Sequence, residues 1–409
     1  MGCRQKLRSL IGAKSPRLLP PFAGVPSTPS PSPPIKVSAL FAAVSALCLV
    51  GFANTGTPTS EIVLGQSCAL TGPAGALGNG MRDGLQAAFA EYGEINGNTI
   101  KLITMDDGYE PNRAIENTRK LLDENKVFML IGEVGTPTSK AVVPVAEEAG
   151  VPFFGPFTGA EFLRGQERNL IVNVRGSYYQ EMERLAKYLV DEKGLTKIAC
   201  FYQNDGYGQA GLSGIELALE RRGMELAGTG TYERNTVAVK SGLLQIRKAS
   251  PEAVIMVGAY KPCAEMIKLA KRSGMKDTVF CNISFVGTKA LLSELGEAGE
   301  GCIISQVVNF PWDESVPLVK EYQASMKKHL PEASTGFVSL EGYMVGKLFC
   351  EALSKTEGEV TPAAVLSTIN RVSKWDLGGV HMEFTETDRQ GMDEVFLTVI
   401  KGGEIQPLN

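Results

Sequence analysis

The chain has 409 residues, of which 44% are hydrophobic and 21% charged, the composition of a globular protein with room for two or three domains. Residues 1–53 hold six basic and no acidic side chains, so the rest of the chain carries 35 basic against 45 acidic residues. This balance leaves no basic stripe for a phosphate backbone, and nucleic acid is excluded as an expected partner.

The first 53 residues have the composition of a leader rather than of a folded domain. Residues 16–34 contain eight prolines, which cannot build a core. An uncharged apolar run of 16 residues, 37–52, follows Lys36 and ends in Gly51-Phe52-Ala53. A basic flank, an apolar run and a small-x-small exit are typical of a secretory signal peptide, and a bilayer span needs about 20 residues. We expect cleavage after Ala53 or a start codon further downstream, with a membrane anchor as the alternative.

The mature chain then alternates strands with helices. Strands are predicted at 61–69, 99–105, 127–132 and 151–154, and helices at 80–91, 112–125 and 139–150. The same order recurs further along, with strands at 197–202, 225–232, 253–257 and 278–282, and helices at 179–193, 210–222, 239–250 and 262–274. Strands that alternate with helices of this length predict a parallel sheet in each half.

The remaining segments are predicted to connect the two halves. A strand at 170–175 leaves the first half, a strand at 302–308 carries the chain back, and helices follow at 315–329, 336–354 and 361–372. Residues 380–384 and 394–400 are expected to pair as an antiparallel ribbon. The predicted fold is therefore α/β, with two similar lobes of parallel sheet flanked by helices and joined by a three-crossover hinge. We assign 61–175 and 309–376 to an N-terminal lobe, and 178–306 and 379–409 to a C-terminal lobe, which the hinge can close over a ligand.

Neither the cysteines nor the acidic residues form a metal motif. The sequence has no CxxC, and its two histidines are far from any cysteine, so a zinc site is disfavoured and no metal or cofactor is expected. Asp106 and Asp107 are expected to cap a turn before Pro111. Disulfide pairing among the cysteines after Ala53 cannot be deduced from spacing; they are Cys68, Cys200, Cys263, Cys281, Cys302 and Cys350.

The expected binding region lies beyond the carboxyl ends of the strands, where ligands of open parallel sheets gather. The loops there are 69–80, 135–139 and 155–160 in the first lobe, and 204–208, 258–262 and 282–288 in the second. They are rich in Gly, Thr, Ser and Tyr and nearly free of charge. Helices begin at several of them, and free N–H groups at a helix start bind carboxylates.

From Glu61 onward, the order and spacing of several segments resemble the type I solute-binding proteins of ABC importers, the family of the leucine/isoleucine/valine-binding proteins. The segments that carry this resemblance are 70–73 (LTGP), 106–111 (DDGYEP), 131–136 (IGEVGT), 155–158 (GPFT), 205–211 (DGYGQAG) and 258–260 (GAY). None is specific alone, but together they extend over most of the chain.

The resemblance also implies a set of ligand contacts. It places Thr136 on the ligand carboxylate, and it places Tyr207 and Tyr260 against the ligand body. The small-polar loop after the fourth strand adds Phe157, Thr158 and Ala160. Two positions depart from the family pattern: Ser284 and Phe285 stand where an acid would pair with a ligand amino group, and Leu77 stands in place of an aromatic. Both changes disfavour a zwitterion, because burying an ammonium without a counter-charge is costly.

The expected function is that of an extracytoplasmic receptor. The protein is expected to be a periplasmic monomer that captures a hydrophobic amino acid, or a related apolar carboxylate or amide, for an ABC permease. A ligand-sensing receptor of the same fold is the alternative. A remoter alternative is an NAD-dependent enzyme, since 75–80 (GALGNG) follows a strand, but its order is GxxGxG and not GxGxxG. We expect no catalysis, because the strand-end loops hold no His or Cys apart from Cys263 in a helix's first turn.

Overall fold

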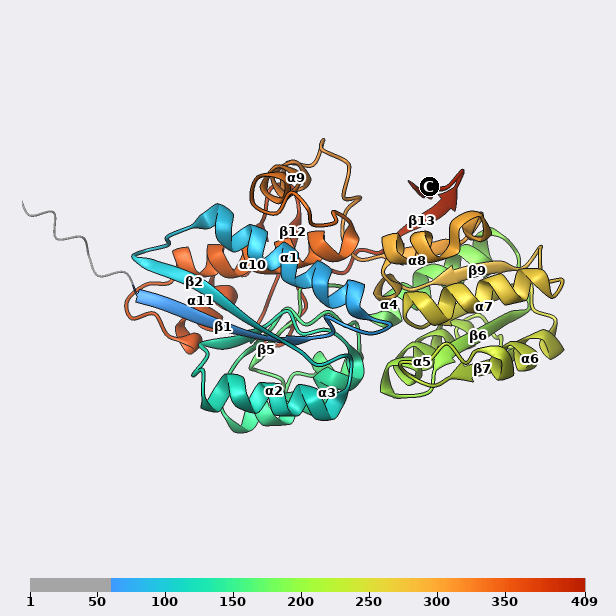
Figure 1. The fold of residues 1–409 in the computed structure, drawn as a ribbon, viewed down its shortest axis with the longest axis horizontal. Coiled ribbons are helices and arrows are strands. Elements are labelled where there is room, and N and C mark those ends of the chain that lie inside the picture. The colour runs from blue at the N-terminus through green and yellow to red at the C-terminus, as the bar shows by residue number, and fades with distance from the viewer. Residues whose placement is uncertain (1–59, 409) are drawn as a thin grey trace, which may run out of the picture. The chain divides into compact units, whose positions relative to one another are not determined.

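The computed structural model describes residues 60–408, and within them the chain builds two α/β lobes around two separate sheets (Figure 1). The first lobe contains a five-stranded sheet in the order β2-β1-β3-β4-β5, and every pairing in it is parallel. The strands are β1 (Ser60–Cys68), β2 (Asn98–Asp106), β3 (Met129–Ile131), β4 (Phe153–Phe154) and β5 (Ile171–Val172). The predicted α/β class is confirmed. The expected leader lies outside the described residues.

Helices cover both faces of the first sheet. Helices α2 (Pro111–Asp123) and α3 (Thr136–Glu148) bury their apolar sides on one face. Helices α1 (Gly75–Tyr92) and α10 (Phe337–Ser354) pack together on the other face, although about 250 residues of chain separate them. The first lobe is therefore completed by a helix from the last quarter of the chain.

The second lobe contains a seven-stranded sheet in the order β14-β13-β10-β9-β8-β6-β7. Five of its strands are parallel, whereas β13 runs antiparallel to both β10 and β14. The strands are β6 (Ile198–Gln203), β7 (Gly228–Tyr232), β8 (Ala253–Val257), β9 (Val279–Asn282), β10 (Ile303–Gln306), β13 (Phe396–Lys401) and β14 (Glu404–Pro407). The fully buried β8 reads as a continuous apolar run, AVIMV, as expected of a central parallel strand.

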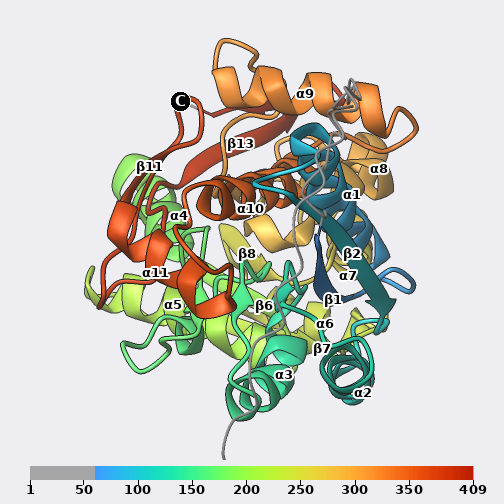
Figure 2. The same cartoon turned by 90° about the vertical axis from the view of Figure 1, so that its left-hand side faces the viewer.

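The helices of the second lobe also form two layers (Figure 2). Helices α4 and α5 contact one another, and α6 contacts α7, which contacts α8. Their bounds are α4 (Tyr178–Ala186), extended by a π-helical turn (Lys187–Glu192), α5 (Gly206–Glu220), α6 (Lys240–Ala249), α7 (Tyr260–Arg272) and α8 (Thr288–Leu295). Among residues 60–408, no helix combines the length and the apolar character that a membrane crossing requires.

The prediction that residues 380–384 and 394–400 pair as an antiparallel ribbon was wrong. Strand β12 (His381–Glu383) pairs instead with β11 (Lys374–Asp376), across the turn that contains Gly378 and Gly379. Strand β13 joins the second sheet beside β10. The β11–β12 hairpin follows α9 (Pro317–His329) and α11 (Pro362–Val372), and it is tied to α9 by a bond from the Leu318 amide to the Gly378 carbonyl.

Helix α1 begins at Gly75, five residues before the predicted start at Gly80. The segment 75–80, read from the sequence as a loop, is therefore the first turn and a half of a helix. Gly78 allows this early start, because a Cβ there would lie 2.0 Å from the Ala69 carbonyl oxygen at the end of β1. Leu77 is consequently a buried helical residue.

Glycines also permit the close contact between α1 and α10. A Cβ on Gly84 of α1 would lie 2.1 Å from the Ser339 carbonyl oxygen, and one on Gly342 of α10 would lie 2.4 Å from the Met81 carbonyl oxygen. Both obstacles are helix backbone, which cannot move aside as the end of a side chain can. The two helices must therefore separate if either glycine gains a side chain.

We expect Gly84→Ala to lower the free energy of unfolding by about 2–3 kcal/mol, because the added methyl overpacks this contact. Chemical denaturation monitored by circular dichroism measures the change. Gly206→Ala is the control: its Cβ would meet only the Lys140 side chain at 3.9 Å, and we expect a change within about 0.5 kcal/mol. Equal stability of the two variants would contradict the proposed role of Gly84.

Candidate functional site

A chain of buried hydroxyl groups lies at the carboxyl ends of the first-lobe strands. Thr136 opens α3 directly after Gly135, whose φ of 111° suits glycine. The Thr136 and Thr158 hydroxyl oxygens are 2.7 Å apart, and Thr158 donates to the Tyr178 hydroxyl at 3.3 Å. The Ala160 amide donates to the Thr158 hydroxyl at 3.3 Å. The loops after β3 and β4 therefore present their polar groups at one place, as the sequence predicted.

Five aromatic side chains surround this place, and we call them the aromatic cluster. Phe285, from the second lobe, lies at its centre: its ring centroid is 4.6 Å from that of Tyr207 and 5.4 Å from that of Phe157. Tyr109 lies 6.0 Å from Phe285, and Tyr178 lies 5.5 Å from Tyr207. Each of the five side chains is at most 1% exposed. Both lobes thus contribute to one apolar, buried interface.

One hydroxyl of the aromatic cluster has no partner. Tyr207 follows Asp205, whose carboxylate caps α5 by accepting from the Tyr207 amide at 3.0 Å. This cap directs the Tyr207 ring into the cluster, where its hydroxyl is buried and forms no hydrogen bond. Burial raises the pKa of Tyr207 well above its ordinary value. A buried, unpaired hydroxyl is costly unless another molecule satisfies it.

Leu77 and Tyr260 lie apart from the aromatic cluster, on a cavity of about 410 Å³. Residues of α1, α7, α8 and the start of α10 line it, so both lobes contribute. The Tyr260 hydroxyl accepts from the Ala76 amide at 3.4 Å, and a Cβ on Gly287 would lie 2.5 Å from the Leu77 side chain. These two predicted residues therefore meet across the lobes, at a different part of the interface from Thr136.

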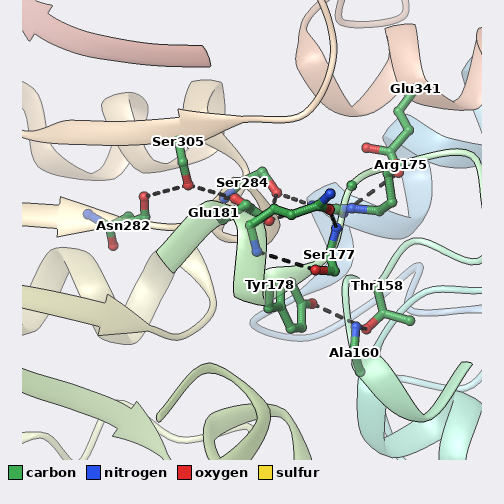
Figure 3. A network of polar contacts seen from close by, with 12 residues as sticks. Thr158, Ala160, Arg175, Ser177, Tyr178, Glu181, Asn282, Ser284, Ser305 and Glu341 are labelled. Carbon is green, nitrogen blue, oxygen red and sulfur yellow. Dashed lines mark hydrogen bonds and ion pairs between the residues drawn. The ribbon is translucent and has the colours of Figure 1, made fainter. Parts of the chain in front are cut away.

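A buried network of charges joins the lobes beside the aromatic cluster (Figure 3). The Arg175 guanidinium contacts Glu181 of α4 at 3.2 Å and Glu341 of α10 at 3.6 Å. Its Nη2 also donates to the Ser284 hydroxyl of the second lobe. All three charged side chains are 0–3% exposed. Arg175, which lies in the segment that crosses between the lobes, therefore contacts residues of both lobes. We call Arg175, Glu181, Ser284 and Glu341 the hinge network.

The start of α4 positions Tyr178 of the aromatic cluster and Glu181 of the hinge network. Ser177 and Gln180 form a capping box at the helix start, each side chain bonding the other's backbone amide. Tyr178 and Glu181 then lie three residues apart on one face of the helix. Tyr178 consequently reaches the first-lobe hydroxyls, while Glu181 reaches the second-lobe serines.

The two carboxylates of the hinge network are unequal. Glu181 accepts from the Ser284 amide at 2.8 Å, the Ser284 hydroxyl at 2.9 Å and the Ser305 hydroxyl at 2.6 Å, in addition to Arg175. Glu341 has only the 3.6 Å ion pair with Arg175. Burial raises the pKa of Glu341 to about 7, against the opposing attraction of Arg175. Glu341 is thus the carboxylate of the two that is more easily protonated.

A third interlobe contact, which we call the rim latch, consists of Glu110, Arg234 and Asn235. The Glu110 carboxylate accepts from Arg234 at 2.9 Å and from Asn235 at 2.6 Å. Asn235, in the left-handed conformation with φ 59°, also donates to the Gly108 carbonyl at 3.0 Å. Glu110 precedes α2 of the first lobe, whereas the other two residues follow β7 of the second. The lobes are therefore clasped at a rim as well as at the hinge network.

The structure brings most of the predicted site residues together. Thr136, Phe157, Thr158, Tyr207 and Phe285 lie in or against the aromatic cluster, with Ala160 beside it. Ser284 lies in the hinge network, where Glu181 supplies the acid that the sequence around Ser284 lacks. Sequence reasoning missed Tyr109, Tyr178, Arg175, Glu181 and Glu341. Arg175 could have been found, because a lone arginine ends the apolar run LIVNV at a predicted crossover.

No group of three or more His, Cys, Asp or Glu side chains arranged to hold a metal ion occurs between residues 60 and 408. The six cysteines of this part are all buried and unpaired. The segment 75–80 belongs to α1, and the Gly78 position lies against the Ala69 carbonyl, so this helix start does not form the open loop of a dinucleotide site. The buried hydroxyls, rings and guanidinium instead suit enclosure of a small organic molecule.

Glu341 should make stability pH-dependent. Its folded pKa of about 7 exceeds the ordinary 4.5, so between these values the folded state binds the extra proton and stability falls as pH rises. Between pH 5 and 8, this titration should lower the free energy of unfolding of the wild type by about 2 kcal/mol, and Glu341→Gln should abolish that decrease. Denaturation at each pH measures the difference. The exposed Glu386→Gln should keep the wild-type profile. Parallel profiles for Glu341→Gln and the wild type would contradict this assignment.

Comparison with known proteins agrees with this geometry. A family model described as periplasmic binding protein matches residues 61–404. The Leu/Ile/Val-binding protein homolog 7 of Brucella abortus is 26% identical over 337 residues, which cover 78% of this chain and 83% of that protein. The Leu/Ile/Val-binding protein of Escherichia coli is 22% identical, over 74% of this chain and 81% of its own.

Solved structures match over the same region. The crystal structure of a possible leucine/isoleucine/valine-binding protein from Rhodopirellula baltica is 36% identical, with a TM-score of 0.82, and the match covers 87% of this chain and 98% of that one. A substrate-binding periplasmic protein from Ralstonia solanacearum is 24% identical, with a TM-score of 0.79. The chain therefore belongs to the periplasmic binding protein family, in its type I branch with the Leu/Ile/Val-binding proteins.

Proposed function

We propose that this protein is the extracytoplasmic receptor of an ABC-type importer, which captures a small apolar ligand between its lobes and delivers it to a membrane permease. The observation that carries the proposal is the aromatic cluster with its buried hydroxyls, built from both lobes at the carboxyl ends of their strands. Such a place binds ligands in open α/β sheets. The family and the expected signal peptide support a periplasmic monomer that works beside a permease.

The proposed ligand is a hydrophobic amino acid or a related apolar carboxylate or amide. The names of the relatives from Brucella and Escherichia coli support an aliphatic amino acid. The chemistry of the cluster supports an apolar body, because five aromatic rings surround a few hydroxyl groups. Thr136 and Thr158 would bond the polar end of the ligand, while Phe157, Tyr207 and Phe285 would cover its body.

Capture would proceed by closure. With the lobes apart, the first-lobe hydroxyls face solvent and receive the ligand first. As the second lobe swings in, Tyr207 and Phe285 enclose the ligand, and Tyr260 closes the interface beside Leu77. Ligand binding shifts the population toward the closed form only to the extent that the ligand binds that form more tightly. The rim latch and the Arg175–Ser284 bond join the two lobes, and closure would form them.

We expect Thr136→Ala to weaken ligand binding about tenfold, because one hydrogen bond to the polar end of the ligand is lost. Titration calorimetry measures this, with leucine, phenylalanine and their deaminated acids as the ligands. Thr136→Ala combined with Tyr260→Ala should weaken binding further.

Thr138→Ala is the matched control for this prediction. Thr138 is a buried threonine of the same helix, but its hydroxyl bonds back to the Val134 carbonyl at 2.7 Å. It should leave affinity within twofold of the wild type. Equal affinities for Thr136→Ala and the wild type would contradict the proposed placement of the ligand.

Glu110→Ala tests the rim latch. Removing this carboxylate deletes two bonds that hold the closed form, so we expect the tightest of these ligands to bind about fivefold more weakly and to dissociate faster. Stopped-flow fluorescence measures the dissociation rate.

Glu147→Ala removes a comparable ion pair, to Arg168 at 2.7 Å, that lies wholly within the first lobe. This control should bind as the wild type does. An equal loss in both variants would show that the effect of Glu110→Ala does not come from closure.

A further inference from the structure

The Arg175 guanidinium has hydrogen-bonding capacity that the protein leaves unused. Its side chain is fully buried, and its Nη2 donates to Glu181 and Ser284. The remaining nitrogens, Nε and Nη1, form no hydrogen bond, since Nη1 has only Glu341 at 3.6 Å. Buried guanidinium donors without acceptors are costly, so an acceptor supplied by a ligand would be stabilised there.

The guanidinium that carries these unused donors lies against two rings of the aromatic cluster. The Arg175 Cζ lies 4.9 Å from the centroid of the Phe157 ring and 5.8 Å from that of Tyr178. The Tyr178 hydroxyl, in turn, bonds Thr158. Tyr178 therefore contacts both the guanidinium and the Thr158 hydroxyl.

The network offers no comparable place for a cation. Each oxygen of Glu181 is already engaged: Oε1 by Arg175 and Ser284, and Oε2 by the Ser284 amide and Ser305. An ammonium near Glu181 would displace one of these bonds and would lie beside a buried guanidinium of like charge. An acidic group meets the opposite situation, because it can accept a charge-assisted hydrogen bond from the unused Nη1 of Arg175.

We propose that Arg175 binds the carboxylate of the ligand, and that the ligand class is an apolar or aromatic monocarboxylic acid without an ammonium group. The proposal rests on the proposed function and narrows it from hydrophobic amino acids and amides to simple carboxylates. The ligand carboxylate replaces Glu341 as the partner of Nη1, which leaves Glu181 and Ser284 on Nη2. The high pKa of Glu341, about 7 through burial, supports this exchange, since that carboxyl gives up its charge readily.

The test compares ligands of one carbon skeleton on the full-length mature protein by titration calorimetry. The compounds are 3-phenylpropionate, phenylalanine and 3-phenylpropanamide, together with 4-methylpentanoate, leucine and 4-methylpentanamide. We expect the carboxylate of the better-fitting skeleton to bind at least about 30-fold more tightly than its amide and its amino acid. A preference for the amino acid in both series would overturn the inference and leave the proposed function standing. Absence of saturable binding across these and a wider set of amino acids and amides would overturn the proposed function itself.

Arg175→Gln separates a ligand contact from a structural role. It should weaken binding of the carboxylate at least about tenfold more than it weakens binding of the amide, because both ligands lose the interlobe contacts of Arg175 but only the carboxylate also loses the charge. Arg168→Gln removes an arginine paired with Glu147 inside the first lobe and should change neither. Equal losses for carboxylate and amide would overturn the inference. If Arg175→Gln does not fold, the wild-type ligand series decides by itself.

Discussion

The buried guanidinium of Arg175 is the constraint on which the interface between the lobes depends. A charge without solvent needs partners, and Arg175 takes them from α4, from α10 and from the loop after β9. The loop after β9 belongs to the second lobe and α10 to the first, so Arg175 joins the two lobes in the form that the structure describes. The residues around them, Tyr178 and Phe157, are brought into the aromatic cluster by the same contacts. Charge pairing at the crossover and apolar packing among the rings therefore occur at one place.

The parts of the fold with a regular pattern could be predicted from the sequence. Apolar strands of four to nine residues separated by helices indicated two parallel sheets, and the rule that ligands lie at strand carboxyl ends brought Thr136, Thr158 and Phe157 together. The same rule marked the second-half loops that hold Tyr207 and Phe285, and the family resemblance singled out these residues as ligand contacts. These residues owe their positions to short loops fixed by the strands on which they depend, so their placement follows from local order along the chain.

The errors arose where tertiary contacts override local preference. Helix α1 starts inside a glycine-rich segment of low helix propensity, because only glycine fits against the end of β1 there. The β11–β12 hairpin formed where Gly378-Gly379 provides a two-glycine turn, a signal that was present and was passed over in favour of a longer pairing. The hinge network joins residues that lie more than 100 positions apart, and such contacts cannot be predicted from the spacing of residues along the sequence. The family pattern has an acid on the loop of Ser284 that this sequence lacks, and Glu181 reaches that loop from another helix.

The contact between α1 and α10 has a consequence for how the chain is made. Residues 75–92 cannot bury their apolar side until residues 337–354 exist, since the two helices cover one another across a glycine-lined seam. During synthesis from the amino end, the first half therefore remains without its closing layer until the ribosome has produced most of the molecule.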